Sequence, residues 1–290
     1  MVRVLVLLAL GSAVLLAARS GSAAAGSPGS PTALLIGDSV GTGMSWHGDA
    51  IAVMQKNLNI DWQVAICRRL IGESCDPGDG EPVPPTLVDL ISSMSSVPAT
   101  VVVEMGYNDF ESTFAEAVDD TMQALLAKGA QHVLWLTLRE ARDPYPALNA
   151  ILAQKAAQYP QLELLDWNAL SVNRPGWFQN DFVHLVDAGG VAMAHLIHGA
   201  VIALYAPLHT VGAVPSPRAG RRYAAELRAT GGTPPYRWRV TSGRPPRGLH
   251  LLANGRLYGH VTAGARMSFG VSVTDADGMI ASEELGDETR

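Results

Sequence analysis

The sequence has no basic stripe and few charged residues. Charged residues make up 17% of the 290 positions, and the formal net charge is −6. A nucleic-acid partner is therefore not expected, because such binding needs clustered positive charge. Several arginines lie near the C-terminus among prolines and glycines, and we interpret them as a solvated face. With 48% hydrophobic residues, the chain has enough apolar side chains for a globular protein with a sizeable core.

Long apolar runs are also scarce, and the one that stands out has the marks of export. Arg3 precedes a nearly unbroken apolar run over residues 4–18, and the small residues at 22–25 offer a cleavage site. We expect residues 1–25 to be a signal peptide and 26–32 a linker, with the protein secreted or held in the cell envelope. An uncleaved anchor is the alternative, although the run is shorter than the roughly 20 residues of a bilayer span. We expect no other segment to be long and apolar enough to cross a membrane.

Cysteine is limited to two positions, Cys67 and Cys75. In the oxidising compartment that export implies, we expect them to form a disulfide. A metal site built on these two cysteines is the alternative, but no further His or Cys ligand lies near them in the sequence. We therefore expect no metal at this pair.

From residue 33 to residue 205, short apolar runs alternate with helical patterns. This alternation predicts an α/β domain over 33–206 with a parallel sheet covered on both faces. Ligands of such sheets bind beyond the carboxyl ends of the strands. The expected strands are 33–36, 61–66, 99–105, 132–138 and 162–166, and the expected helices are 45–58, 86–96, 113–128, 145–158 and 188–205.

After residue 205 the helical patterns end, and turn signals recur at short intervals. We expect a linker over 207–216 and a small β-sandwich over 217–290. Asn254 and Gly255 predict a hairpin turn between two alternating segments. The tail after Gly278 is short and acidic, so we expect the closing strand to be missing or irregular.

Ser39 follows the first expected strand in the segment LLIGDSVGTG. It has three interpretations: a nucleophile, a helix N-cap or part of a phosphate-binding loop. The phosphate loop is disfavoured because Gly43 is followed by Met44 rather than by Lys, and Trp46 stands where a dinucleotide fingerprint needs its third glycine. Taken alone, Ser39 is more often a cap than a catalyst.

Two further motifs supply what a serine nucleophile needs. GYND, which contains Asn108, directly follows the third expected strand, and DFVHL contains Asp181 and His184 three positions apart. Alone, GYND is ordinary turn chemistry, and His184 could be a structural histidine at a helix entry. Together the motifs bring a nucleophile, an oxyanion donor, a base and a carboxylate to one sheet edge.

The three motifs GDSV, GYND and DFVHL resemble blocks of the SGNH, or GDSL-like, serine hydrolases, and the resemblance covers about residues 33–205. It implies a three-layer flavodoxin-like sheet and ester hydrolysis without a metal or other cofactor. It also implies that Ser39 is the nucleophile, His184 the base and Asp181 the group that orients the base. The backbone N–H of Ser39 and the side chain of Asn108 would bind the oxyanion.

The second block departs from the family pattern, which usually places a glycine after the second strand as a third oxyanion donor. Here that strand runs into CRRLIGESC. Arg68 stands near the strand end, and Gly72 is the nearest glycine. Any residue except proline has the required N–H, so we expect Arg68 or Gly72 to supply the third donor.

The C-terminal segment resembles the Ig-like modules of exported bacterial proteins, which implies a spacer or an adhesion unit with cell-surface or polysaccharide contacts. The expected substrate is a small-molecule, lipid or carbohydrate ester. The alternatives are an O-acyltransferase that uses the same acyl-enzyme and an inactive surface-binding protein.

Arg139 and Glu140 follow the fourth expected strand, where they either contact a polar substrate or form a salt-bridged loop. We expect structural roles for His132, His195 and His198. Trp135, Trp167 and Trp177 could line an acyl or sugar pocket, but aromatic residues near strand ends are more often part of the core.

Overall fold

The first half of the fold is a five-stranded parallel sheet with the strand order β2-β1-β3-β4-β5. The computed structural model describes residues 30–211, 214–218, 220–261 and 267–286, so the expected signal peptide lies outside the described residues. The inner strands are buried on both faces, as their continuous apolar runs predict. The strands are β1 (Thr32–Gly37), β2 (Asn59–Val64), β3 (Thr100–Glu104), β4 (His132–Leu136) and β5 (Leu162–Leu165).

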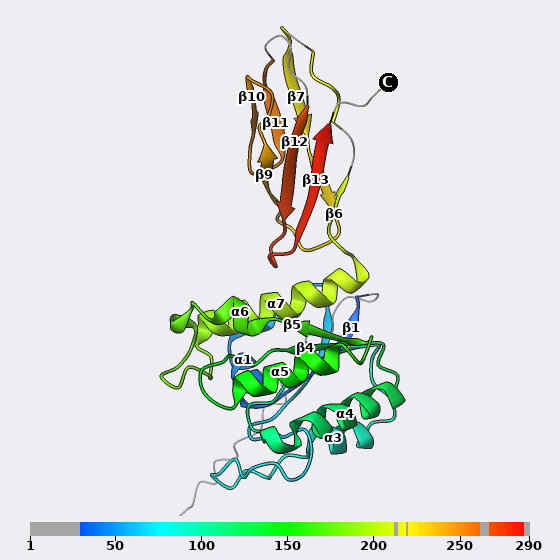
Figure 1. The fold of residues 1–290 in the computed structure, drawn as a ribbon, viewed down its shortest axis with the longest axis vertical. Coiled ribbons are helices and arrows are strands. Elements are labelled where there is room, and N and C mark those ends of the chain that lie inside the picture. The colour runs from blue at the N-terminus through cyan, green and yellow to red at the C-terminus, as the bar shows by residue number, and fades with distance from the viewer. Residues whose placement is uncertain (1–29, 212–213, 219, 262–266, 287–290) are drawn as a thin grey trace, which may run out of the picture.

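Helices cover both faces of this sheet and make a three-layer α/β fold, as predicted (Figure 1). On one side α7 packs against α1 and α2, and on the other α4 packs against α3 and α5. The helices are α1 (Ser39–Met44), α2 (Gly48–Met54), α3 (Leu87–Ser93), α4 (Glu111–Ala127), α5 (Tyr145–Ala156), α6 (Trp167–Ser171), the 3₁₀ turn η1 (Pro175–Trp177) and α7 (Asp187–Tyr205).

The segment after β1 differs from the expected single helix over 45–58. Helix α1 begins earlier, at Ser39, and ends at Met44. The chain then turns, because His47 has an extended backbone (φ −99°, ψ 110°), and α2 begins at Gly48. The early start of α1 brings Ser39 to the first turn of a helix at the carboxyl edge of the sheet.

The expectation that no later segment is long and apolar enough to cross a membrane was wrong, because helix α7 meets that criterion by length and composition. Half of its most apolar window is buried within the protein. Its buried side chains, among them Met193, Ile197 and Val201, join the same core as the sheet. Its apolar character is therefore explained by its place in the core.

The remaining strands are antiparallel and form a separate β structure with its own core around Trp238, Leu257, Phe269 and Val271. Asn254 and Gly255 lie in the turn between β10 and β11, as predicted. The strands are β6 (His209–Val211), β7 (Arg222–Glu226), β8 (Arg228–Thr230), β9 (Arg237–Gly243), β10 (Leu249–Leu251), β11 (Arg256–His260), β12 (Ser268–Thr274) and β13 (Ile280–Gly286).

The expectation of a missing or irregular closing strand was wrong. β13 pairs with β12 in register over its whole length. Along β13, Leu285 is buried while its neighbours Glu284 and Gly286 are exposed. The acidic composition had hidden this alternation, because the carboxylates lie where a strand can keep them in contact with water.

The two structures meet where the β12–β13 turn contacts α7. Asp277 Oδ1 lies 2.7 Å from His195 Nδ1, and Asp277 Oδ2 lies 2.7 Å from His198 Nδ1. His198 Nε2 also lies 2.7 Å from the carbonyl oxygen of Lys56. A Cβ at Gly199 would come within 2.8 Å of the Asp277 side chain, so this glycine allows the turn to approach the helix.

Candidate active site

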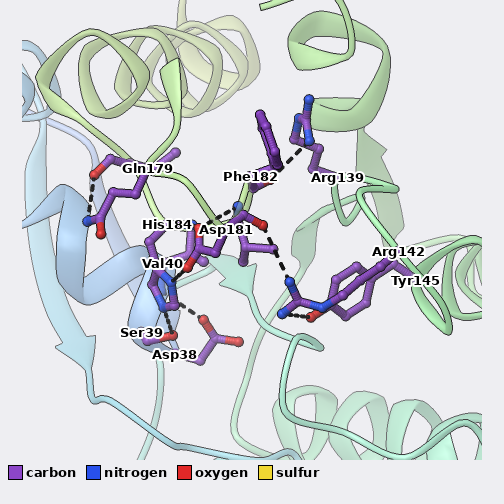
Figure 2. A network of polar contacts seen from close by, with 12 residues as sticks. Asp38, Ser39, Val40, Arg139, Arg142, Tyr145, Gln179, Asp181, Phe182 and His184 are labelled. Carbon is purple, nitrogen blue, oxygen red and sulfur yellow. Dashed lines mark hydrogen bonds and ion pairs between the residues drawn. The ribbon is translucent and has the colours of Figure 1, made fainter. Parts of the chain in front are cut away.

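Ser39 occupies the first position of α1, directly after β1. The N-cap of this helix is Asp38, whose carboxylate accepts a hydrogen bond from the N–H of Val40 at 3.0 Å. The interpretation of Ser39 as the cap was therefore wrong. Its hydroxyl oxygen lies 2.9 Å from Nε2 of His184 instead (Figure 2).

The segment before α7 holds Asp181 against His184. Asp181 Oδ2 lies 2.5 Å from His184 Nδ1, and its Oδ1 accepts hydrogen bonds from the backbone N–H groups of Val183 and His184. Partial burial raises the pKa of Asp181, but these hydrogen bonds outweigh burial and leave that pKa below its ordinary value. An ionised Asp181 can accept a hydrogen bond from the Nδ1–H of His184, which leaves Nε2 able to accept the Ser39 proton.

Buried carboxyl groups lie under the nucleophile. Burial is the largest effect on Asp38 and raises its pKa to about 7, against the opposing hydrogen bond from Val40. Burial and the neighbouring Asp38 also raise the pKa of Glu104 well above its ordinary value. Glu104 Oε2 accepts a hydrogen bond from the N–H of Gly41 at 2.7 Å, and a Cβ at Gly41 would approach that oxygen to 2.9 Å. Gly41 thus lets the first turn of α1 sit directly on β3.

Asn108 lies at the carboxyl end of the next strand, β3, in the turn that begins at Gly106. The side-chain amide of Asn108 donates to the backbone carbonyl of Arg68 at 3.2 Å. The backbone carbonyl of Asn108 accepts a hydrogen bond from Arg69 Nε at 2.8 Å. The neighbouring Asp109 accepts a hydrogen bond from the N–H of Leu70 at 2.9 Å. These contacts join the loops after β2 and β3 and fix the Asn108 amide.

Of the two candidates for a third oxyanion donor, Arg68 is the one that contacts Asn108. Its side chain is buried and donates to the carbonyls of Gln63 and Pro85, which holds its peptide in place. Gly72 has φ +77° and open space around its Cα. Arg68 is therefore the candidate that adjoins a predicted site residue.

The disulfide between Cys67 and Cys75 is confirmed. It closes the loop after β2, in which the N–H of Cys75 also donates to the carbonyl of Cys67 at 3.2 Å. Beside this loop lies a groove of about 560 Å³, lined by Thr42, Arg68 and a run of prolines at 82 and 84–85. Thr42, one of the residues that line this groove, lies on the same helix as Ser39.

Of the other residues singled out from the sequence, some lie in the core and others lie near the site. Trp135 and Trp167 are fully buried core residues, and Trp177 stacks on Trp167 with ring centroids 5.8 Å apart. Glu140 accepts a hydrogen bond from Asn149, whereas Arg139 points to the segment that carries Asp181. Within the described residues, no group of three or more His, Cys, Asp or Glu side chains could hold a metal ion.

The sequence did not indicate that Arg139 and Arg142 together contact the Asp181–His184 segment. Arg139 Nη1 donates to the carbonyl of Phe182 at 3.0 Å, and Arg142 Nη1 to that of Asp181 at 3.4 Å (Figure 2). The position of Arg139 after β4, at the same sheet edge, was the only signal that could have indicated this role.

The geometry at this sheet edge is that of a serine hydroxyl, an imidazole and a carboxylate in series, an arrangement used by serine hydrolases on several folds. No family model matches the sequence. A curated relative is the O-acetyltransferase OatA of Staphylococcus aureus strain NCTC 8325, which is 27% identical over 164 residues. The match covers 57% of this chain and 24% of that protein, so it spans about a quarter of the length of the relative.

Comparison with solved structures gives weak overall likenesses. The esterase EstA from Pseudoalteromonas sp. has a TM-score of 0.43 at 12% identity, covering 58% of this chain and 94% of that one. A family two carbohydrate esterase from Cellvibrio japonicus has a TM-score of 0.42 at 14% identity, with 59% and 60% coverage. A tail fiber protein of an E. coli phage has a TM-score of 0.41 at 12% identity, covering 84% of this chain and 34% of that one.

Proposed function

We propose that this protein is a serine esterase that hydrolyses acyl or acetyl esters through a Ser39–His184–Asp181 triad. The observation that carries the proposal is the continuous contact from Ser39 Oγ to His184 Nε2 (2.9 Å) and from His184 Nδ1 to Asp181 Oδ2 (2.5 Å). The Ser39–His184 contact does not follow from secondary structure alone, because Ser39 begins α1 whereas His184 lies in the segment before α7.

The reaction follows from the chemistry of these groups. Ser39 Oγ attacks the carbonyl carbon of the ester while His184 Nε2 takes its proton. His184 then gives that proton to the departing alcohol as the ester C–O bond breaks, which leaves an acyl group on Ser39. A water molecule, deprotonated by His184, attacks the acyl carbon. The bond from that carbon to Ser39 Oγ then breaks as His184 returns the proton to Oγ, and the acid is released. Asp181 remains ionised throughout and stabilises the imidazolium.

The developing oxyanion would be bound by the backbone N–H of Ser39 and the side-chain amide of Asn108. The third donor would be the N–H of Arg68, which would first have to release the carbonyl of Ala65, at 3.4 Å in this structure. The N–H groups at the start of α1 favour negative charge at this position. In this structure the Asn108 amide donates to the Arg68 carbonyl, so it has to share or exchange that hydrogen bond when an ester binds. The loop between Cys67 and Cys75 holds the Arg68 peptide next to this amide.

An O-acyltransferase is the second candidate, favoured by the match to the O-acetyltransferase OatA. The same acyl-enzyme would form, and an alcohol rather than water would accept the acyl group. The two candidates share every residue named above and differ only in the acceptor. Product analysis with and without added alcohols, such as methyl glycosides, separates ester transfer from hydrolysis.

We further propose that the protein is exported and that residues 217–290 form an Ig-like module outside the catalytic domain. The substrate would then be an ester of the cell surface or its surroundings, either a lipid or an acetylated carbohydrate. Export is supported by the character of residues 1–25 and by the disulfide, since disulfides persist in oxidising compartments.

The direct test is hydrolysis of p-nitrophenyl acetate by the purified protein and by Ser39→Ala. The matched control is Ser45→Ala, because Ser45 caps the end of the same helix and donates to the carbonyl of Thr42. We expect Ser39→Ala to lose activity by a factor of about 10⁴ or more, as triad removal does elsewhere, and Ser45→Ala to retain it. Equal activity in Ser39→Ala and the unmodified protein would reject the serine mechanism.

A further inference from the structure

Asp181 and Phe182 are exposed in the Asp181–His184 segment, whose backbone is strained. Phe182, between the two residues, has φ +58° and an exposed ring. A bulky residue in this left-handed region is uncommon, and such a conformation persists only where the surroundings hold it. Within the segment, the N–H of Phe182 donates to the carbonyl of Gln179, and the N–H of Gln179 to the carbonyl of His184. The carbonyls of Asp181 and Phe182 take no part in these two local bonds.

Those two carbonyls are held by two arginines from the loop after β4. Arg139 Nη1 donates to the carbonyl of Phe182 at 3.0 Å, and Arg142 Nη1 to that of Asp181 at 3.4 Å. Figure 2 shows both guanidinium groups directed at the segment from the side opposite Ser39. The segment is thus held between the nucleophile on one side and two positive charges on the other.

The Arg139 guanidinium is itself fixed by two aromatic rings, one before the segment and one inside it. Its Cζ lies 4.4 Å from the ring centroid of Phe178 and 5.7 Å from that of Phe182. Such stacking restricts the planar group and directs its donors. The Arg139 side chain therefore contacts both Phe178, which precedes the segment by three positions, and the strained residue inside it.

The backbone of Arg139 is tied to the loop that carries Asn108. The N–H of Arg139 is held in place because it donates to the hydroxyl of Tyr107 at 2.8 Å. The Tyr107 ring packs edge-on against Tyr145 at 5.1 Å, and the Tyr145 hydroxyl accepts from Arg142 Nη2 at 3.2 Å. The two arginines and two tyrosines thus connect the neighbour of Asn108 with the segment of Asp181.

We propose that Arg139 and Arg142 are positioning residues that hold Asp181 and His184 in reach of Ser39, with Arg139 carrying the larger share. This inference rests on the proposed function, because it concerns the same triad. Neither guanidinium is assigned a contact with substrate. Their effect is on the geometry of the base, and a displacement of about 1 Å in such a group can cost about 10² in rate.

The test compares Arg139→Met and Arg142→Met, which keep much of the apolar side chain but remove the guanidinium donors. The matched control is Arg174→Met, because Arg174 stacks over Trp177 at 5.6 Å on the adjoining turn η1. With p-nitrophenyl acetate, we expect Arg139→Met to lower kcat by about tenfold to a hundredfold, with KM changed far less. The loss in Arg142→Met should be smaller, because its bond is longer, and Arg174→Met should match the unmodified protein.

A second readout does not depend on turnover. The proton between His184 Nδ1 and Asp181 Oδ2 should give a downfield proton NMR resonance in the unmodified protein, lost or broadened in Arg139→Met, while the thermal unfolding curve shows that the variant is folded. An unchanged resonance and kcat in folded Arg139→Met would overturn the proposal. A raised KM with unchanged kcat would also overturn it and would make Arg139 a substrate contact. Loss of the resonance in a protein whose Ser39→Ala variant keeps full activity would uphold the positioning role and reject the proposed function instead.

Discussion

The hydroxyl of Ser39 lies 2.9 Å from Nε2 of His184, although 145 positions separate the two residues in the sequence. The contact arises because β1 and the segment before α7 both end at the carboxyl edge of the same parallel sheet. Asp38 takes the capping role at the start of α1, which leaves the Ser39 hydroxyl for His184. This division of roles between neighbouring residues underlies the predictions that follow.

Asp181→Asn should lower kcat by about 10⁴, because an amide favours the wrong histidine tautomer and cannot stabilise the imidazolium. The Asn side chain can still accept from the N–H groups of Val183 and His184, so we expect the loop to keep its fold. Steady-state kinetics with p-nitrophenyl acetate measure the effect. Asp187→Asn is the control, since Asp187 pairs with His47 rather than His184. Equal losses in both variants would contradict the assigned role of Asp181.

Asn108→Ala should lower kcat by about 10²–10³, the usual cost of removing one oxyanion donor. KM should change little, because the hydrogen bond strengthens as charge develops on the oxygen. The separate kcat and KM values check this expectation. A rise in KM with an unchanged kcat would show instead that Asn108 serves ground-state binding.

Removal of the Cys67–Cys75 disulfide should destabilise the protein by about 2–3 kcal/mol, the chain-entropy cost for so short a loop. The double variant Cys67→Ser, Cys75→Ser can be compared with the unmodified protein by urea unfolding. Since the loop carries Arg68, kcat should fall as well. A variant with unchanged kcat would show that the loop keeps its shape without the bridge, and that the disulfide is not needed to hold the Arg68 peptide.

The contact of His198 with Asp277 should make stability depend on pH. Burial lowers the pKa of His198, but the hydrogen bonds to Asp277 and to the Lys56 carbonyl outweigh it and leave that pKa raised. Burial raises the pKa of Asp277, but the hydrogen bonds to His198 and His195 outweigh it and leave that pKa lowered. The His198–Asp277 pair therefore contributes its full stabilisation of the folded protein between two pH limits. The lower limit is the ordinary pKa of Asp, about 4, and the upper limit is the ordinary pKa of His.

This stabilisation is lost as the pH rises through the raised pKa of His198 and as it falls through the lowered pKa of Asp277. At pH 5.5, Asp277→Asn should be less stable than the unmodified protein by about 3 kcal/mol, because it leaves a buried imidazolium unpaired. The difference should shrink by pH 9. Urea unfolding at both pH values tests this, with His132→Gln as a control histidine outside the junction. A difference that is independent of pH would contradict a charged His198.

Much of the parallel sheet could be predicted from the sequence, because continuous β-branched runs such as residues 99–105 have few alternative folds. The motifs around Ser39, Asn108 and His184 were likewise visible, since each follows an expected strand. The early start of α1 was not, because Gly41 and Gly43 are poor helix formers, and the close approach of Gly41 to Glu104 is seen only in the folded chain. The acidic β13 was missed because composition concealed its alternation.

The arginine contacts with the Asp181–His184 segment could not be predicted from local patterns. Arg139 Nη1 reaches a backbone carbonyl 43 positions away, and no sequence motif encodes a bond to a carbonyl. The contact of Asp277 with His195 and His198 is similar, since it joins a turn and a helix that become neighbours only in the folded chain. Long-range polar contacts of this kind depend on the fold and not on spacing.

Covalent labelling of Ser39 tests the central claim most directly. A fluorophosphonate reacts with a serine only where a neighbouring base activates it, so peptide mapping by mass spectrometry locates the nucleophile without knowledge of the substrate. We predict a single modified peptide that contains Ser39, labelled rapidly in the unmodified protein and in Ser45→Ala but much more slowly in His184→Ala. Labelling at another serine, or equal labelling of Ser39 without His184, would contradict the proposed triad.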